Sequence, residues 1–245
     1  RTSGILTATI TTGAVTSTLA AITNVDANDE ITFTTNDTSV DASDLVALAL
    51  KVDTLGVNSV TTITEAYNTA NVATVVTNAL NITGNTELVS ITGGSILATD
   101  VNTILGATSG NVTAIVTADT AAALNTALTN ATTGTDALTL TINDTTLTSV
   151  SDLLALDGKT NVAVNASSVN SITDTYTNLN SVYAANTAGT ISGLGNEAVT
   201  ISDTTSAANV NTIAGKTSGV LTATITTGAV TSTLAAITNV DANDE

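Results

Sequence analysis

Threonine and apolar residues alternate in several short stretches, and each stretch has the pattern of a half-buried β-strand. A period of two places threonine on one face of a strand and Ala, Ile, Leu or Val on the other. Thr, Val and Ile also favour strands because their branched Cβ restricts χ1. Nine strands are predicted in this way: LTATIT from Leu6, ITFTT from Ile31, LGVNS from Leu55, LVSIT from Leu88, NVTAIVT from Asn111, LTLTI from Leu138, VAVNA from Val162, AVTIS from Ala198 and LTATIT from Leu221.

The residues after these stretches change to a helical period. Val169, Ile172, Tyr176, Leu179 and Val182 recur at steps of three and four, which predicts a helix over 169–183. Similar spacing at 15–22 and 124–128 predicts two more helices. Shorter helical segments are predicted where an Asp or Asn precedes an apolar pair: DLVALALKV from Asp44, DVNTILGAT from Asp100, DLLALDGKT from Asp152 and NVNTIAGKT from Asn209.

The chain also repeats itself over a long period. Residues 2–30 and 217–245 differ only at Ile5 and Val220, so the sequence restarts after 215 residues. The four short helical segments divide this long repeat into units of about 54 residues. The predicted units are 2–52, 53–107, 108–159, 160–216 and a restart at 217–245.

Each unit halves into modules of about 27 residues, and each half carries a predicted strand followed by a helical segment. Successive strands joined by helical crossovers pair in parallel, and such crossovers are right-handed. The fold class predicted for residues 1–245 is therefore α/β, as one continuous right-handed β/α solenoid with a parallel sheet. An all-β parallel β-helix is the alternative, although it does not account for the helical spacing.

The amino-acid composition excludes several kinds of catalytic, metal-binding and partner-binding chemistry. The chain has no His, Cys, Met, Pro or Trp, which excludes thiol and histidine catalysis, disulfides and zinc sites with soft ligands. Its formal net charge of −17 opposes binding to nucleic acid and to anionic membrane surfaces. No apolar run approaches the length needed to span a bilayer. We expect no enzyme, no nucleic-acid partner and no membrane insertion.

One cluster of acidic residues is a candidate metal site. Asp26, Asp29 and Glu30 lie within five residues, and the restart repeats them as Asp241, Asp244 and Glu245. Calcium takes oxygen ligands of this kind, so the chain needs no cofactor but has one candidate ion. The alternative is that these are solvated turn residues and helix caps, and Asp41, Ser43 and Asp44 are interpreted as caps.

A resemblance appears once the units are aligned. DLLALDGKT from Asp152, VAVNASSVNSIT from Val162 and TISGLGNEAVTISDTT from Thr190 resemble repeat modules of very large surface and secreted proteins of bacteria, cyanobacteria above all. The resemblance implies an extracellular or cell-surface protein with a structural or adhesive role. It supplies no catalytic residue.

Repetition also indicates how the chain is used. A stack of modules buries its core only between neighbours, and the restart at 217 carries no distinct capping sequence. We expect a structural segment of an extracellular filament or giant surface protein that joins identical repeats head to tail or laterally. The alternative is a calcium-stabilised adhesin or stalk that binds glycans or neighbouring cells.

Overall fold

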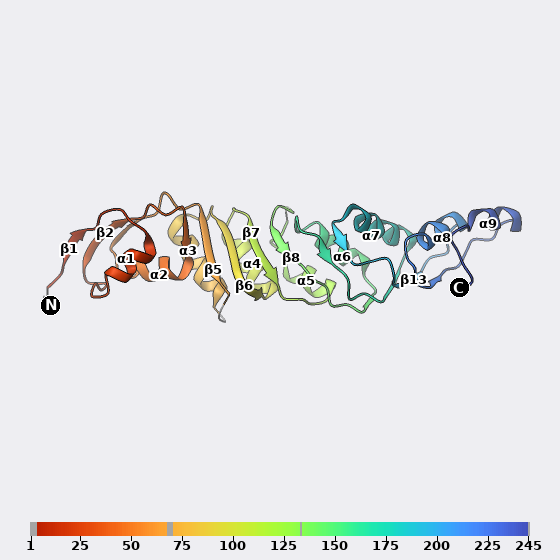
Figure 1. Ribbon diagram of the computed structural model, residues 1–245, viewed down its shortest axis with the longest axis horizontal. Coiled ribbons are helices and arrows are strands. Elements are labelled where there is room, and N and C mark those ends of the chain that lie inside the picture. The colour runs from red at the N-terminus through yellow and green to blue at the C-terminus, as the bar shows by residue number, and fades with distance from the viewer. Residues whose placement is uncertain (1–3, 68–70, 133, 245) are drawn as a thin grey trace. The chain divides into compact units, whose positions relative to one another are not determined.

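Short parallel strands alternate with short helices in the computed structural model, which describes residues 4–67, 71–132 and 134–244 (Figure 1). The predicted α/β class is confirmed, and the helices exclude the all-β alternative. Two compact units are distinguished along the chain, residues 1–115 and 116–245. One continuous solenoid over 1–245 stays a prediction.

The first unit carries four helices and seven strands in its described part. Its helices are α1 (Val15–Ala21), α2 (Ala42–Ala49), α3 (Val72–Thr83) and α4 (Ala98–Ala107). Its strands are β1 (Thr7–Thr9), β2 (Glu30–Thr34), β3 (Ser39–Asp41), β4 (Thr54–Gly56), β5 (Thr62–Ala66), β6 (Leu88–Ile96) and β7 (Val112–Val116), the last of which reaches the boundary with the second unit.

The second unit carries five helices and seven strands in its described part. Its helices are α5 (Ala121–Ala127), α6 (Val150–Asp157), α7 (Tyr176–Ala188), α8 (Ala207–Ala214) and α9 (Val230–Ala236). Its strands are β8 (Ala137–Thr139), β9 (Thr146–Leu147), β10 (Val164–Asn165), β11 (Ser171–Asp174), β12 (Ile191–Ser192), β13 (Ala198–Ile201) and β14 (Leu221–Thr222).

Strands pair in parallel with strands of the next module. In the first unit β1, β2 and β4 form one sheet, and β3, β5, β6 and β7 lie in that order in another. In the second unit the order β14-β13-β11-β9 forms one sheet and β10 pairs with β12. Paired residues are offset by 22 to 27 positions, as in Thr32 with Thr54 and Ser171 with Ala198. This register agrees with a module of about 27 residues.

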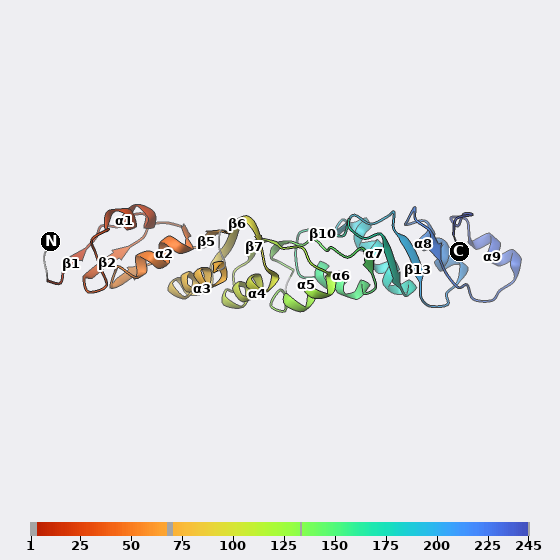
Figure 2. The ribbon, with the colours of Figure 1, turned by 90° about the horizontal axis from the view of Figure 1, so that it is seen from below.

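The core of each unit lies between its strands and helices. Phe33, Leu45 and Ile63 are fully buried in the first unit, and Leu153 and Tyr183 in the second. Neighbouring helices pack on each other in sequence order, α2 on α3 and α5 on α6 among them. Figure 2 shows α3 and α4 side by side, with β6 and β7 along the other edge. Of these five residues, only Ile63, in β5, lies outside the predicted strands and helices.

Two details of the prediction are wrong. The predicted helix over 169–183 begins only at Tyr176, because Ser171–Asp174 form β11 and pair with β13. The described part also has fourteen strands where the alternation predicted nine. Five modules carry a second short strand before the helix, such as β5 before α3, where a single strand was predicted for each half of a unit.

Threonine side chains link neighbouring modules through a recurrent pair of hydrogen bonds. Thr108 Oγ1 donates to the main-chain oxygen of Glu87 at 2.8 Å and accepts from Gly110 N at 2.9 Å. Thr217 makes the same pair with Glu197 O and Gly219 N, at 2.6 and 3.0 Å. A Cβ at Gly110 would lie 2.2 Å from Glu87 O, so only glycine allows the two main chains to approach this closely.

Candidate functional site

The acidic cluster at 26–30 forms a turn that is tied to the first strand. Asp26 Oδ1 accepts from Asn28 N at 2.9 Å, and Asp29 Oδ2 accepts from Asp26 N at 3.3 Å. Asp29 Oδ1 also accepts from Leu6 N at 2.9 Å, just before β1. Glu30 Oε2 accepts from Thr7 Oγ1 at 3.0 Å. These carboxylates therefore fix the return of the chain to the sheet.

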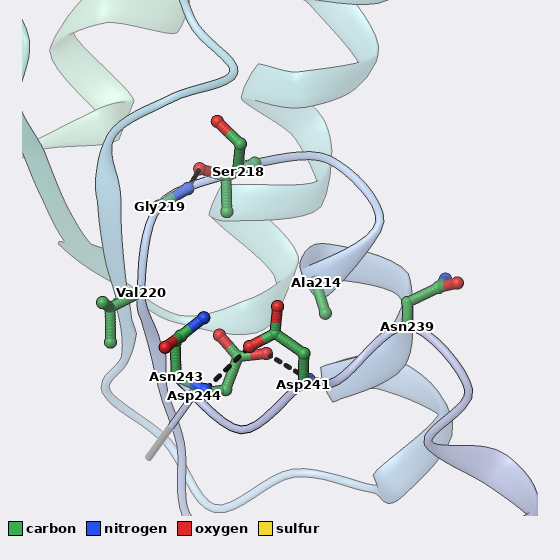
Figure 3. A pocket seen from close by; sticks show the side chains of 9 residues that line it. Ala214, Ser218, Gly219, Val220, Asn239, Asp241, Asn243 and Asp244 are labelled. Carbon is green, nitrogen blue, oxygen red and sulfur yellow. Dashed lines mark hydrogen bonds between the residues drawn. The ribbon is translucent and has the colours of Figure 1, made fainter.

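The second copy of the cluster makes the same turn. Asp241 Oδ1 accepts from Asn243 N at 2.7 Å, and Asp244 accepts from Asp241 N at 3.0 Å and from Leu221 N at 2.8 Å. Figure 3 shows the two carboxylates beside a hollow of about 240 Å³. Glu245 lies outside the described residues, so its part of the prediction has no structural account.

Hydrogen bonding bears on the calcium hypothesis. Asp26, Asp29, Asp241 and Asp244 all accept main-chain N–H groups, so each already has a structural role in its turn. Within residues 4–67, 71–132 and 134–244, no group of three His, Cys, Asp or Glu side chains is arranged to hold a metal ion. The turn interpretation accounts for the geometry of both copies, and calcium binding stays a prediction.

A second set of carboxylates caps helices of the preceding module. Asp37 Oδ2 accepts from Val15 N at the start of α1, at 2.7 Å. The remaining pairs are Asp144 with Ala121 N at 2.7 Å, Asp174 with Val150 N at 3.2 Å, Asp203 with Tyr176 N at 2.8 Å and Glu65 with Ser43 N at 3.0 Å. Each acceptor lies 22 to 27 residues after its donor. A negative charge at a helix N-terminus is favourable because the exposed N–H groups and the helix dipole are positive there.

These caps were only partly visible in the sequence. Asp37, Asp144 and Asp203 recur at the same place after a predicted strand, but the pattern does not say which helix they serve. Asp174 and Glu65 were missed, because β11 and β5 were not predicted. Of the three predicted local caps, Asp41 is confirmed, since its side chain accepts from Ser43 N and Asp44 N, both at 3.1 Å; Ser43 and Asp44 lie inside the first turn of α2.

Four acidic residues are buried in the described part of the chain: Glu65, Glu87, Asp136 and Glu197. Glu197, 1% exposed, accepts from Tyr183 Oη and from Gly195 N and Asn196 N at 2.7 and 3.0 Å. Burial, followed by the hydrogen bond to Glu197 and its negative charge, raises the pKa of Tyr183 far above its ordinary value of 10. Burial and the charge of Asp41 raise the pKa of Glu65.

An apolar groove lies beside the last helix of the second unit. The Val230 and Leu234 side chains are 79% and 68% exposed there, and no residue of α9 is buried. The groove has a volume of about 390 Å³ and is lined by Ile225, Thr226, Gly228, Val230, Thr233, Leu234 and Ile237. It is one face of the module that repeats residues 4–30.

Comparisons with protein-family models, with curated proteins and with solved structures found no match for the chain. The resemblance to repeats of bacterial surface proteins therefore stays a prediction. No helix in the described ranges has the length and apolar character needed to cross a membrane.

Proposed function

We propose that this chain is a structural repeat segment of an extracellular filament or giant cell-surface protein. Its modules would form a right-handed β/α solenoid that assembles end to end into a fibre or layer, with no catalytic role. The parallel pairing at offsets of 22 to 27 residues supports the solenoid, because each module adds strands beside those of the previous module.

One observation carries the proposal. The sequence VTSTLAA occurs twice, as α1 and as α9, and its valine is 1% exposed as Val15 but 79% exposed as Val230. In the first copy, the second module (residues 31–53, with β2, β3 and α2) covers this valine. The α9 groove is therefore shaped to receive a module of the same kind, and an apolar face of this size is typical of an interaction surface.

Analytical ultracentrifugation and negative-stain electron microscopy over a concentration series test the proposal. We expect particles that lengthen with concentration by whole copies. Leu234→Asp should keep the chain monomeric because it places a charge in the groove. Ala235→Asp is the matched control, since the equivalent Ala20 stays exposed in the covered copy. Isolated single copies at every concentration would contradict the proposal.

The calcium-stabilised adhesin is the alternative proposal. The observation in its favour is the polar hollow beside Asp241 and Asp244, whose carboxylates flank an open space (Figure 3). Isothermal titration with Ca²⁺ and thermal melts with and without EDTA separate the two proposals. Absence of both binding heat and a shift in the melting temperature would remove the calcium alternative and leave the filament proposal intact.

A further inference from the structure

The two copies of the repeated module are exposed on opposite faces. In the first module (residues 4–30), Val15 is 1% exposed and Leu6 is 48% exposed. In the last module (residues 217–244), the equivalent Val230 is 79% exposed and the equivalent Leu221 only 1%. Each copy therefore lacks, among the described residues, the neighbour that the other copy has.

Main-chain contacts repeat the same complementarity. A Cβ at Gly219 would lie 2.3 Å from Glu197 O, whereas its equivalent Gly4 has no atom within 4 Å of that position. Conversely, Val15 N donates to Asp37, and no carboxylate of residues 134–244 takes that place at Val230 N. The last module therefore makes its contacts with residues 195–216, and the first module makes its contacts with the second module.

We propose that two copies of the chain join by exchange. The last module of one copy replaces the first module of a second copy and packs against the second copy's β2 and α2. The joint then contains one module covered on both faces: by residues 195–216 of its own chain and by residues 31–53 of the other. This inference rests on the proposed end-to-end assembly and names its partner surface.

Sequence identity makes the replacement possible. The two modules differ only at Ile5 and Val220, and both of these side chains are exposed. All the contacts that α1 makes with α2 are therefore available to α9. Among them, Thr16 Oγ1 donates to Asp44 Oδ2 at 2.8 Å, and Thr231 stands at the equivalent place in the last module.

The free energy that favours exchange follows from the number of ordered modules and of interfaces between them. In a stack, stability is a sum of interfaces between neighbours, which favour folding, and of the ordering of each module, which opposes it. Exchange preserves the number of interfaces, because the interface lost by the displaced module is remade by an identical one. One module fewer is ordered, so the conformational entropy of the displaced segment is recovered. This gain opposes the entropy lost when two chains associate.

Disulfide trapping on the full chain tests the exchange, since the protein has no cysteine of its own. Thr231→Cys protein is mixed with Asp44→Cys protein in a thiol-disulfide redox buffer, and the mixed disulfide is measured. We expect at least tenfold more of it than for a mixture of Ser232→Cys and Asp44→Cys. Thr16, the equivalent of Thr231, donates to Asp44 in the covered copy, whereas Ser17, the equivalent of Ser232, donates to Ala14 O. The double variant Thr16→Cys/Asp44→Cys closes within one chain and shows that the geometry permits a bond.

The outcomes distinguish the exchange from the assembly on which it rests. Equal yields from the Thr231 and Ser232 mixtures, with growth still seen in ultracentrifugation, would overturn the exchange and leave end-to-end assembly standing. Equal yields with single copies at all concentrations would overturn both. Hydrogen exchange provides a second readout: in assembled material residues 15–22 should lose protection and residues 230–237 should gain it.

Discussion

At the scale of single residues, the triplet Thr-Ser-Gly shows that the neighbouring module decides whether a position tolerates a side chain. The triplet occurs three times and ends at Gly4, Gly110 and Gly219. A Cβ at Gly110 would collide with Glu87 O, and a Cβ at Gly219 with Glu197 O. A Cβ at Gly4 would meet no atom within 4 Å. The same tripeptide therefore requires glycine at two positions and not at the third.

Gly110→Ala should lower the free energy of unfolding by about 1–3 kcal/mol, because its Cβ would meet Glu87 O and the backbone must shift. Gly4→Ala is the matched control. Its Cβ meets nothing, so we expect a change of only a few tenths of a kcal/mol. Equilibrium unfolding in urea, followed by circular dichroism, compares the two. Equal shifts of the midpoint would contradict the steric explanation.

Tyr183 should make stability fall at high pH. Burial and the hydrogen bond to Glu197 raise the pKa of Tyr183 in the folded state, whereas the pKa of the unfolded residue is about 10. Above that pH the unfolded state loses the proton while the folded state keeps it, so the unfolded state gains stability. The contribution of Tyr183 is complete below pH 10 and is lost progressively above it.

Urea unfolding of the native chain and of Tyr183→Phe between pH 8 and 11 measures this contribution. The variant should be less stable at pH 8 by about 1–3 kcal/mol, because Glu197 loses a buried donor. The difference between the two proteins should shrink as the pH rises through 10. A difference that stays constant with pH would show that Tyr183 does not titrate differently in the two states.

At the scale of elements, a carboxylate from the following module caps each of the helices α1, α2, α5, α6 and α7. Asp144 serves α5 in this way across 23 residues of sequence. The helix has only seven residues and its own cap, Thr120, accepts from Ala123 N, so Asp144 satisfies a further exposed N–H, that of Ala121. The acidic charge of the chain is thus partly accounted for by contacts between modules.

Asp144→Ala should destabilise the chain by about 1 kcal/mol, within the usual range for loss of a helix cap. Asp144→Asn should cost less, since the amide oxygen still accepts from Ala121 N but carries no charge. Asp53→Ala, at an exposed carboxylate, is the control. Thermal melts at low and high salt measure these effects. Loss of stability that is equal for Asp144→Ala and Asp53→Ala would argue against the cap.

The same scale shows what the sequence could predict. Long alternations such as LVSIT at β6 and the Asp41 cap of α2 are local signals, and both were identified correctly. The start of α7 was not, because Val169 and Ile172 continue the apolar spacing of the helix although Ile172 belongs to a strand. The caps made by Asp174 and Glu65 depend on register between modules, which no local pattern contains.

At the scale of the whole molecule, a repeated sequence separates intrinsic helix propensity from the effect of neighbours. The helices α1 and α9 have the same seven residues, so their intrinsic helix propensities are equal. Only the surroundings differ: α2 packs beside α1, and the Leu234 face of α9 is open. Any difference in their local stability therefore measures what one neighbouring module contributes.

Native-state hydrogen exchange on dilute, single copies should reveal that contribution. Burying one Val or Leu side chain is worth about 1.5–3 kcal/mol, so covering the valine position alone predicts protection roughly ten- to a hundredfold greater in α1 than in α9. The amides to compare are Thr18 N and its equivalent Thr233 N, which donate to Ala14 O and Ala229 O. Appending a copy of residues 31–53 after residue 245 should raise the protection of α9 to that of α1. If α9 stayed unprotected in the extended chain, the second module could not be its natural cover, and both end-to-end assembly and exchange would lose their structural basis.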